Sequence, residues 1–201
     1  MRIKSLIFYL LLIVVILIFS SCAKNTLFGV VKEIMGDVKI NGTSVKQGTK
    51  IIENSSLKVN KGYCIIVSIK NNIIIRVFND TTLSSKIEKD SSSIVLKKGK
   101  IWTTVTKLKK DERFYVNTVN AVAGVRGTDF IVYYDKSVTG VSVIKGSVSV
   151  SDKKGNEVVL KNNEQTKVKG DNPPDKPSYY NSLLDVTLWE RLLSFIKSLF
   201  S

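Results

Sequence analysis

The chain has 201 residues, a formal net charge of +14, no histidine and two cysteines. The lack of histidine excludes Ser-His-Asp and Cys-His catalysis, and two cysteines alone cannot form a zinc site of the ordinary type. The scattered carboxylates form no catalytic or metal-binding pattern. We therefore expect a non-enzymatic protein without cofactor or metal, in a chain that is long enough for one domain with appendages.

Residues 1–21 have the features of a signal peptide. Arg2 and Lys4 provide a positive start, and residues 6–19 form an unbroken run of fourteen apolar residues. A membrane-spanning helix needs about 20 such residues, so this run suits the apolar core of a signal peptide better than a span. An uncleaved amino-terminal anchor helix is the alternative, and both interpretations hold the protein at a membrane.

Cys22 follows two small residues directly after the apolar run. A cysteine at this place resembles the lipid acceptor of bacterial lipoproteins, and two or more acyl chains anchor a protein stably. We therefore expect residues 22–27 to form a lipidated tether in the bacterial cell envelope, on its periplasmic or surface face. Ala23 is not the Asp that retains some lipoproteins at the inner membrane, which favours the outer membrane. Cys64, left alone, is expected to be a small buried hydrophobe.

Strand patterns of about five residues recur at intervals of about eight to twelve residues along the middle of the chain, which is typical of an all-β roll, sandwich or barrel. Asn41-Gly42 is a strong hairpin signal. Gly36, Gly99 and Gly146 each begin a Gly-x-apolar-x pattern, and this weak internal repeat supports a stacked arrangement. No helix pattern appears before residue 179.

Residues 118–130 separate two alternating strand patterns and differ from both. The stretch is rich in small residues, with Gly124 and Gly127 three positions apart. Glycines at this spacing permit a sharp turn or a close backbone approach. Arg126 stands between apolar and small neighbours, so we expect it to be partly enclosed and paired, with Asp129 as the nearest carboxylate. The stretch is therefore either a structural corner or a contact point for a partner or ligand.

The same stretch resembles the signature of the FecR domain family, in which Arg-Gly-Thr is followed by an acidic or small residue and then an aromatic one. Here the signature stands at Arg126, Gly127, Thr128, Asp129 and Phe130. The resemblance covers residues 28–170. It implies a twisted β-roll or solenoid-like stack of short, mostly antiparallel strands.

Regulators of that family relay an iron-citrate signal and carry a cytoplasmic segment that meets a sigma factor. Only five residues precede the apolar run in this sequence, so we do not expect this chain to perform the sigma-factor half of that task. The resemblance therefore points to a free-standing binding unit, a sensor or scaffold module.

Two segments with different sequence patterns follow the predicted β-domain at the end of the chain. Residues 171–178 contain all three prolines and are expected to form a stiff linker. Residues 179–201 are predicted to form one amphipathic α-helix. Docking on the β-domain, joining a partner or a second copy, and lying on the membrane are three possible fates of its apolar face. That face comprises Trp189, Leu192, Leu193, Ile196, Leu199 and Phe200.

These observations lead to two functional hypotheses. The first is a membrane-anchored, non-catalytic envelope lipoprotein whose FecR-like domain binds a protein partner or ligand. The second is a cationic cell-surface binder of anionic glycan or another polyanion. Because no stripe of aromatic residues accompanies the lysines, the pattern argues against nucleic acid. The lysines could also simply keep the surface soluble. Those considered for polyanion binding are Lys97, Lys98, Lys100, Lys107, Lys109 and Lys110.

Overall fold

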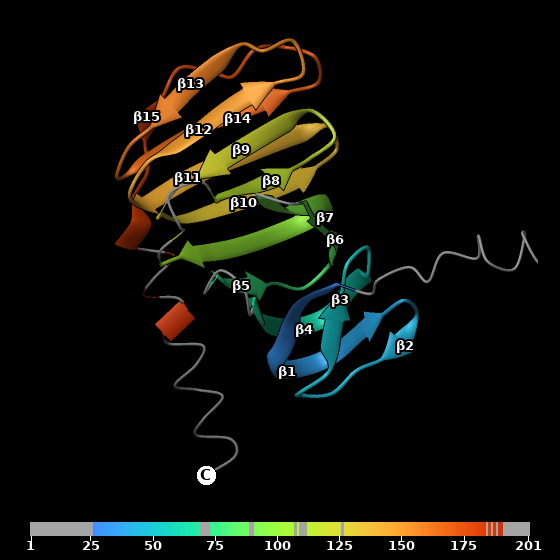
Figure 1. Ribbon diagram of the computed structural model, residues 1–201. Helices are drawn as coiled ribbons and strands as arrows, with labels where there is room; N and C mark the ends of the chain where they lie inside the picture. Colours follow the sequence, from blue (N-terminus) through green and yellow to red (C-terminus); the bar gives the residue numbers. More distant parts are fainter. Residues whose placement is uncertain are drawn as a thin grey trace, which may run out of the picture.

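The computed structural model describes residues 26–190, except 69–72, 89–90, 107, 109–111, 126, 184, 186 and 188. These residues form a sheet of fifteen strands, and the all-β prediction is confirmed (Figure 1). The part of the chain described here contains no helix that is both long and apolar enough to cross a bilayer.

The strands pair almost entirely antiparallel, with β7 and β8 as the one parallel pair among the described strands. In the first half of the chain they are β1 (Leu27–Ile40), β2 (Thr43–Ser44), β3 (Lys50–Ile52), β4 (Ser56–Ser68), β5 (Ile73–Val77), β6 (Thr81–Ile87) and β7 (Ser91–Val105). In the second half they are β8 (Arg113–Asn117), β9 (Ala121–Val125), β10 (Asp129–Asp135), β11 (Val138–Lys145), β12 (Val148–Asp152), β13 (Glu157–Leu160), β14 (Glu164–Lys169) and β15 (Ser178–Tyr179).

The sheet is folded into two layers because its three longest strands run through both. In β7, residues 91–95 pair with β8, whereas residues 99–104 pair with β10. β1 and β4 divide in the same way. The first layer consists of β2, β6, β8, β9, β12 and β13, together with the parts of β1, β4 and β7 that pair with these strands. The second layer is β3, β5, β10, β11, β14 and β15 with the remaining parts. Figure 1 shows this stack rising from β1–β3 to β13–β15.

Glycines occupy the points where the long strands pass from one layer to the other. Gly36 in β1, Gly62 in β4 and Gly99 in β7 have φ angles of +92°, +90° and +98°. Gly36 and Gly62 face each other across the β1–β4 pair, and a Cβ on Gly62 would overlap the carbonyl oxygen of Met35. Only glycine has both the conformational freedom and the small size for these corners.

The weak internal repeat seen in the sequence marks these corners. Gly146, the third member of that repeat after Gly36 and Gly99, connects β11 of the second layer to β12 of the first with φ of +100°. The residues that follow each glycine alternate because each begins a straight strand segment. The repeat therefore records where the chain changes layer, and its unequal spacing follows from the different lengths of the hairpins between corners.

The core lies between the two layers and is filled by alternate side chains of both. Phe114 of the first layer and Phe130 of the second are fully buried, as are Leu57 and Ile66. Cys64 is buried in the same core, and burial raises the pKa of its thiol to about 12. The thiol therefore stays protonated near neutral pH, which fits the small buried hydrophobe predicted from the sequence.

The predicted carboxyl-terminal helix is not supported over its full range of 179–201: the described residues between 182 and 190 are helical, and residues 191–201 lie outside the described residues. Tyr179 lies in β15, opposite Glu164 of β14, because the chain leaving the linker adds to the edge of the second layer. Trp189 is the one member of the predicted contact face that the structure describes. The others lie outside the described residues: Leu192, Leu193, Ile196, Leu199 and Phe200.

The corner at Gly62 can be tested against a matched glycine. Gly48 has a similar φ of +85°, but an added Cβ there would meet nothing within 4 Å. Both Gly→Ala changes carry the strain of positive φ, whereas only Gly62→Ala also drives a Cβ into backbone. We expect Gly62→Ala to lower the free energy of unfolding by at least about 2 kcal/mol more than Gly48→Ala. Urea denaturation measures the difference, and equal losses would contradict the corner argument.

Candidate partner-binding surfaces

The signature stretch carries the chain from the first layer to the second. β9 ends at Val125 and β10 begins at Asp129, so three residues make the crossing. Arg126 lies outside the described residues, and Gly127 is exposed with φ of +70°. Thr128 is buried, its hydroxyl donates to the carbonyl oxygen of Ser147 at 2.9 Å, and its own carbonyl accepts from the Val105 amide at 2.8 Å. These bonds tie the crossing to its neighbours on both sides.

The described residues of the signature point in different directions and do not gather into one site. Gly124 lies on the outer face of the first layer, Asp129 on the outer face of the second, and Phe130 in the core. This geometry favours the corner interpretation for Thr128 and Phe130. It leaves Gly124 and Asp129 available to two separate outer surfaces.

Asp129 is the acceptor of a compact polar network on the second layer. The Trp102 indole N–H donates to its carboxylate at 2.5 Å, and the Thr104 hydroxyl donates at 2.9 Å. Arg76 donates to the Thr104 hydroxyl at 2.9 Å, and its guanidinium lies 4.9 Å from the centre of the Trp102 ring. Burial lowers the pKa of Arg76, and the negative charge of Asp129 opposes that shift.

The sequence prediction missed Arg76, Trp102 and Thr104 as neighbours of Asp129. Arg76 pairs with Trp102 across β5 and β7, and Thr104 pairs with Asp129 across β7 and β10. Their alternation within strands marks them as outward-facing. Nothing in the sequence indicates that the three strands are adjacent, so the network emerges only from the pairing.

Removing the Asp129 carboxylate should leave the buried indole N–H of Trp102 without its acceptor. An unsatisfied buried donor costs about 1–3 kcal/mol. We therefore expect Asp129→Ala to lower the free energy of unfolding by about that amount. Asp129→Asn, which keeps an acceptor oxygen, should cost less. Urea denaturation followed by tryptophan fluorescence measures both, and an Asp129→Ala protein as stable as the Asn variant would contradict the role of this bond.

The outer face of the second layer is covered in part by the end of the described chain. Trp189 is 7% exposed and meets the rings of Tyr63, Phe78 and Trp102 edge-on, at centroid distances of 5.4, 5.4 and 6.4 Å. Such edge-to-face contacts add to the stabilisation that burial of apolar surface provides. Trp189, the one described residue of the predicted contact face, therefore docks on the β-domain, which was one of the three fates considered for that face.

Asp185 reinforces this docking with an ion pair. Its carboxylate lies 2.7 Å from the Lys100 ammonium and also accepts from the Tyr180 hydroxyl. Burial alone would raise the pKa of Asp185, but the hydrogen bonds from Lys100 and Tyr180 outweigh it, so the pKa is lowered. The carboxylate is therefore ionised at neutral pH, and its contribution is lost only as the pH falls through the lowered pKa.

The docked segment predicts a stability difference between two apolar side chains. Trp189 is 7% exposed, whereas Leu183 is 72% exposed in the same segment. Truncation of a buried tryptophan costs about 3 kcal/mol or more. We expect Trp189→Ala to lower the melting temperature clearly and Leu183→Ala to leave it nearly unchanged. Equal melting temperatures for the two variants in thermal denaturation would show that the Trp189 contact does not stabilise the domain.

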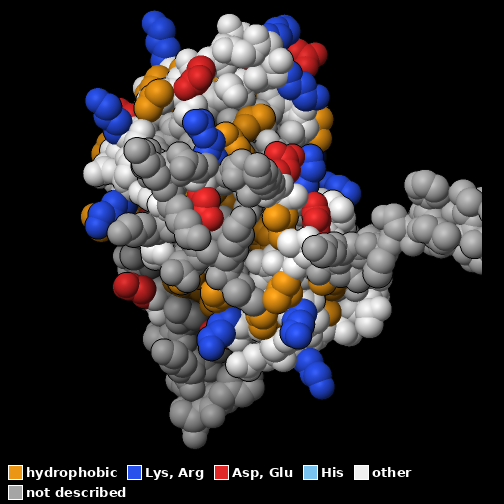
Figure 2. Space-filling model, in the orientation of Figure 1, with side chains coloured by type: hydrophobic (Ala, Val, Ile, Leu, Met, Phe, Trp, Pro, Cys, Tyr) orange, Lys and Arg blue, Asp and Glu red, His pale blue; other side chains and the backbone are white. Residues whose placement is uncertain are grey.

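The lysines considered for polyanion binding are only partly described. Lys98 pairs with Asp80 at 2.6 Å and Lys100 with Asp185, whereas Lys97 is exposed. Lys98 and Lys100 line a hollow of about 560 Å³ that also contains Asp80 and Asp135. On the face shown in Figure 2, the Lys and Arg side chains are dispersed and form no single stripe. Three of the predicted lysines lie outside the described residues: Lys107, Lys109 and Lys110.

The outer face of the first layer contains a second hollow, beside the signature stretch. Tyr115, Gly124, Ser149 and Val159 are direct neighbours across β8, β9, β12 and β13. They line a hollow of about 430 Å³. The Tyr115 ring lies beside Gly124, where an added Cβ would approach it to 3.2 Å. The complete lining is Glu112, Arg113, Tyr115, Gly124, Val125, Ser147, Ser149 and Val159.

Comparison with protein families identifies the central part of the chain. The sequence model of the family described as FecR protein matches residues 55–149. The match runs from the start of β4 into β12 and contains the complete signature. The resemblance to the FecR family predicted from the sequence is confirmed over residues 55–149.

Solved structures support the same fold. Two crystal structures, at 1.65 and 2.50 Å resolution, of a protein described as a "putative anti-sigma factor" from Parabacteroides distasonis ATCC 8503 are similar to this chain. Each has a TM-score of 0.56, with identities of 23% and 24%, and each match covers 67% of this chain and 63% of the other. The chain thus spans less than two thirds of those proteins, and the likeness concerns the fold alone. No protein with a curated description matches the chain.

Proposed function

We propose that this chain is a non-catalytic regulatory module of signal transduction in the bacterial cell envelope, held at the membrane through lipidated Cys22, whose FecR domain binds a protein partner. The family match and the fold shared with the anti-sigma-factor-like protein support the regulatory role. The apolar run followed by Cys22 supports the anchoring, and the lack of histidine supports a binding function without catalysis.

The open hollow on the first layer carries this proposal. The second layer holds Trp189 on its outer face, whereas most of the side chains that line the hollow beside Gly124 are exposed or half-buried. Val159 at its rim is 52% exposed, and Glu112 and Arg113 contribute both signs of charge. A mixed apolar and charged hollow of this kind suits a segment of protein better than a polyanion.

The edge of the first layer specifies how such a segment binds. Within the described residues, β13 pairs only with β12, so its other edge presents backbone groups. An extended segment of the partner can add to that edge as a further strand, with alternate side chains directed into the hollow. In this arrangement main-chain hydrogen bonds provide affinity, and the row from Tyr115 to Val159 provides specificity.

Two exposed valines allow a matched test of this surface. Val159 lies in the hollow, whereas Val119 is 54% exposed in the β8–β9 turn and is not among the residues that line it. Residues 23–201 would be used to capture proteins from envelope extract at low and high salt. We expect capture of a protein at both salt concentrations, retained by Val119→Glu and reduced at least about tenfold by Val159→Glu, which introduces a charge into the contact.

Equal losses in the two variants would refute the hollow as the contact surface. Recovery of an anionic polymer alone, and only at low salt, would favour the alternative function as a polyanion binder. That alternative rests on net charge, and the carboxylates beside Lys98 and Lys100 reduce the positive charge at those two residues. Binding of polyanion at the predicted lysines stays a prediction.

A further inference from the structure

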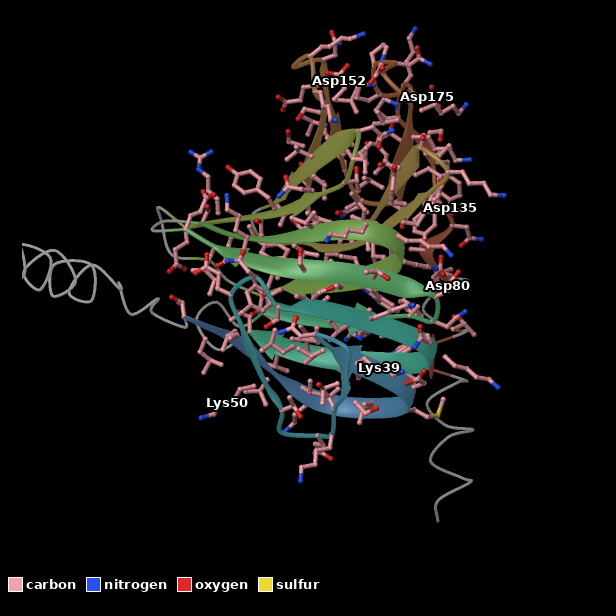
Figure 3. All side chains as sticks on the ribbon, turned by 90° about the vertical axis from the view of Figure 1, so that its right-hand side faces the viewer. Lys39, Lys50, Asp80, Asp135, Asp152 and Asp175 are labelled. Carbon is pink, nitrogen blue, oxygen red and sulfur yellow. The ribbon has the colours of Figure 1, made fainter. Side chains whose placement is uncertain are left out.

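The positive charge of the chain is distributed unevenly along the stack. Residues 26–61, which include β1, β2 and β3, contain six lysines and three carboxylates. Residues 62–110 contain ten basic and three acidic residues, whereas residues 111–190 contain ten basic and eleven acidic residues. The positive excess therefore lies in the first 110 residues, and residues 26–61 are the part of it that adjoins the proposed anchor. In Figure 3 the labelled Lys39 and Lys50 lie in the lower part of the molecule, and the labelled aspartates lie above them. We call this lower, positively charged part the lysine end, defined by Lys32, Lys39, Lys46, Lys50, Lys58 and Lys61.

Three of these lysines are gathered by the turn between β2 and β3. The Gly48 amide donates to the carbonyl oxygen of Val31 at 2.8 Å, and the Val31 amide donates to the Thr49 carbonyl oxygen at 2.9 Å. These bonds hold the turn against β1, beside Lys32. Three exposed ammonium groups therefore project from adjoining backbone positions, those of Lys32, Lys46 and Lys50.

Two further lysines of this end oppose each other directly. Lys39 of β1 and Lys58 of β4 are cross-strand partners. Like charges directly opposite each other destabilise a sheet, whereas a pair of opposite charges would stabilise it. The Lys39–Lys58 pair therefore lowers the stability of the domain. None of the ion pairs among the described residues includes a member of the lysine end. The nearby carboxylate of Asp37 accepts instead from Asn60, at 2.7 Å.

The lysine end is also where the chain approaches its proposed anchor. Thr26 is four residues beyond Cys22, and four extended residues span at most about 14 Å. β1 begins at Leu27, and Lys50 pairs with Val30 near that beginning. Lipidation of Cys22 would therefore hold Lys50 and its neighbours within reach of the bilayer surface, at the opposite end of the stack from β13.

We propose that the lysine end binds the anionic phospholipid headgroups of the membrane that holds the anchor. The position of the lysine end close to the bilayer depends on the proposed lipidation of Cys22, whereas its positive charge does not. Ammonium groups near an anionic leaflet are attracted within a Debye length of about 8 Å, and a basic patch reinforces an acyl anchor. This contact turns the lysine end towards the bilayer and directs β13 with its open edge away from it, where a partner protein can reach the hollow.

The test uses residues 23–201, which contain every described strand and the whole core, and therefore fold without the signal segment. Binding is measured by co-sedimentation with vesicles of phosphatidylglycerol and phosphatidylcholine, and with vesicles of phosphatidylcholine alone. We expect binding only to the anionic vesicles, decreasing as salt rises. Reversal of the charge at Lys32, Lys46 and Lys50 to Glu should weaken it roughly tenfold or more. The same reversal at exposed Lys153, Lys161 and Lys167 provides the control with an equal change in net charge and should retain most of the binding.

A single substitution separates binding from folding. Lys39→Glu places an opposite charge against Lys58, so we expect its melting temperature to rise while binding to anionic vesicles falls. A purely structural role would move both in the same direction.

Three results would overturn the proposal: no binding to anionic vesicles at low salt, equal losses in the two triple variants, or tighter binding of a soluble anionic polysaccharide to the same lysines. The anchor is tested separately by incorporation of labelled palmitate in cells, which Cys22→Ser should abolish. Failure of that labelling would refute the lipidation and leave the vesicle result unaffected.

Discussion

The whole architecture depends on a steric constraint at the corners between its two layers. Gly36, Gly62 and Gly99 have φ angles that L side chains rarely adopt, and backbone or side-chain atoms of the neighbouring strand occupy the space that a Cβ would need. Because these corners are sharp, the three longest strands serve both layers and one continuous sheet encloses one core. Every other feature of the molecule, including the two outer faces and the two ends, is placed by this folding of the sheet.

The two outer faces that result differ in chemistry. On the second layer, large aromatic side chains and the network around Asp129 form a surface on which Trp189 and Asp185 dock. On the first layer, small side chains and Gly124 leave a hollow next to the edge strand β13. A face rich in aromatic residues needs a cover in water, and Trp189 provides part of that cover on the second layer. The mixed apolar and charged hollow of the first layer is therefore the better candidate for contact with a partner.

The two ends of the stack also differ, and we assign membrane contact to one and partner contact to the other. The lysine end lies nearest to the proposed lipid anchor, and β13 lies at the other end of the stack. A small domain with these two different ends can bind an anionic bilayer through one end and a second protein through the other. Such an arrangement suits the proposed regulatory module, in which residues 55–149 match the FecR family.

By itself, the sequence determined what depends on local patterns. Alternation and turn residues predicted an all-β domain, adjacent signature residues identified the FecR family, and Cys64 was correctly expected in the core. The glycine repeat was visible, although its meaning as a set of corners was not. The start predicted for the carboxyl-terminal helix at residue 179 was wrong, because helical periodicity cannot show that Tyr179 pairs with Glu164 at a sheet edge. Most of the predicted range, residues 191–201 included, lies outside the described residues.

Tertiary structure alone decided which distant residues meet. The partners of Asp129 come from β7, and Arg76 joins them from β5, so no spacing in the sequence reveals them. The hollow consists of side chains from four strands and their connections, and the lysine end depends on the turn that folds back on Val31. Local patterns specify strands and corners because these follow from residue size and φ. Surfaces require the strand order, which is set by the energetics of the whole core.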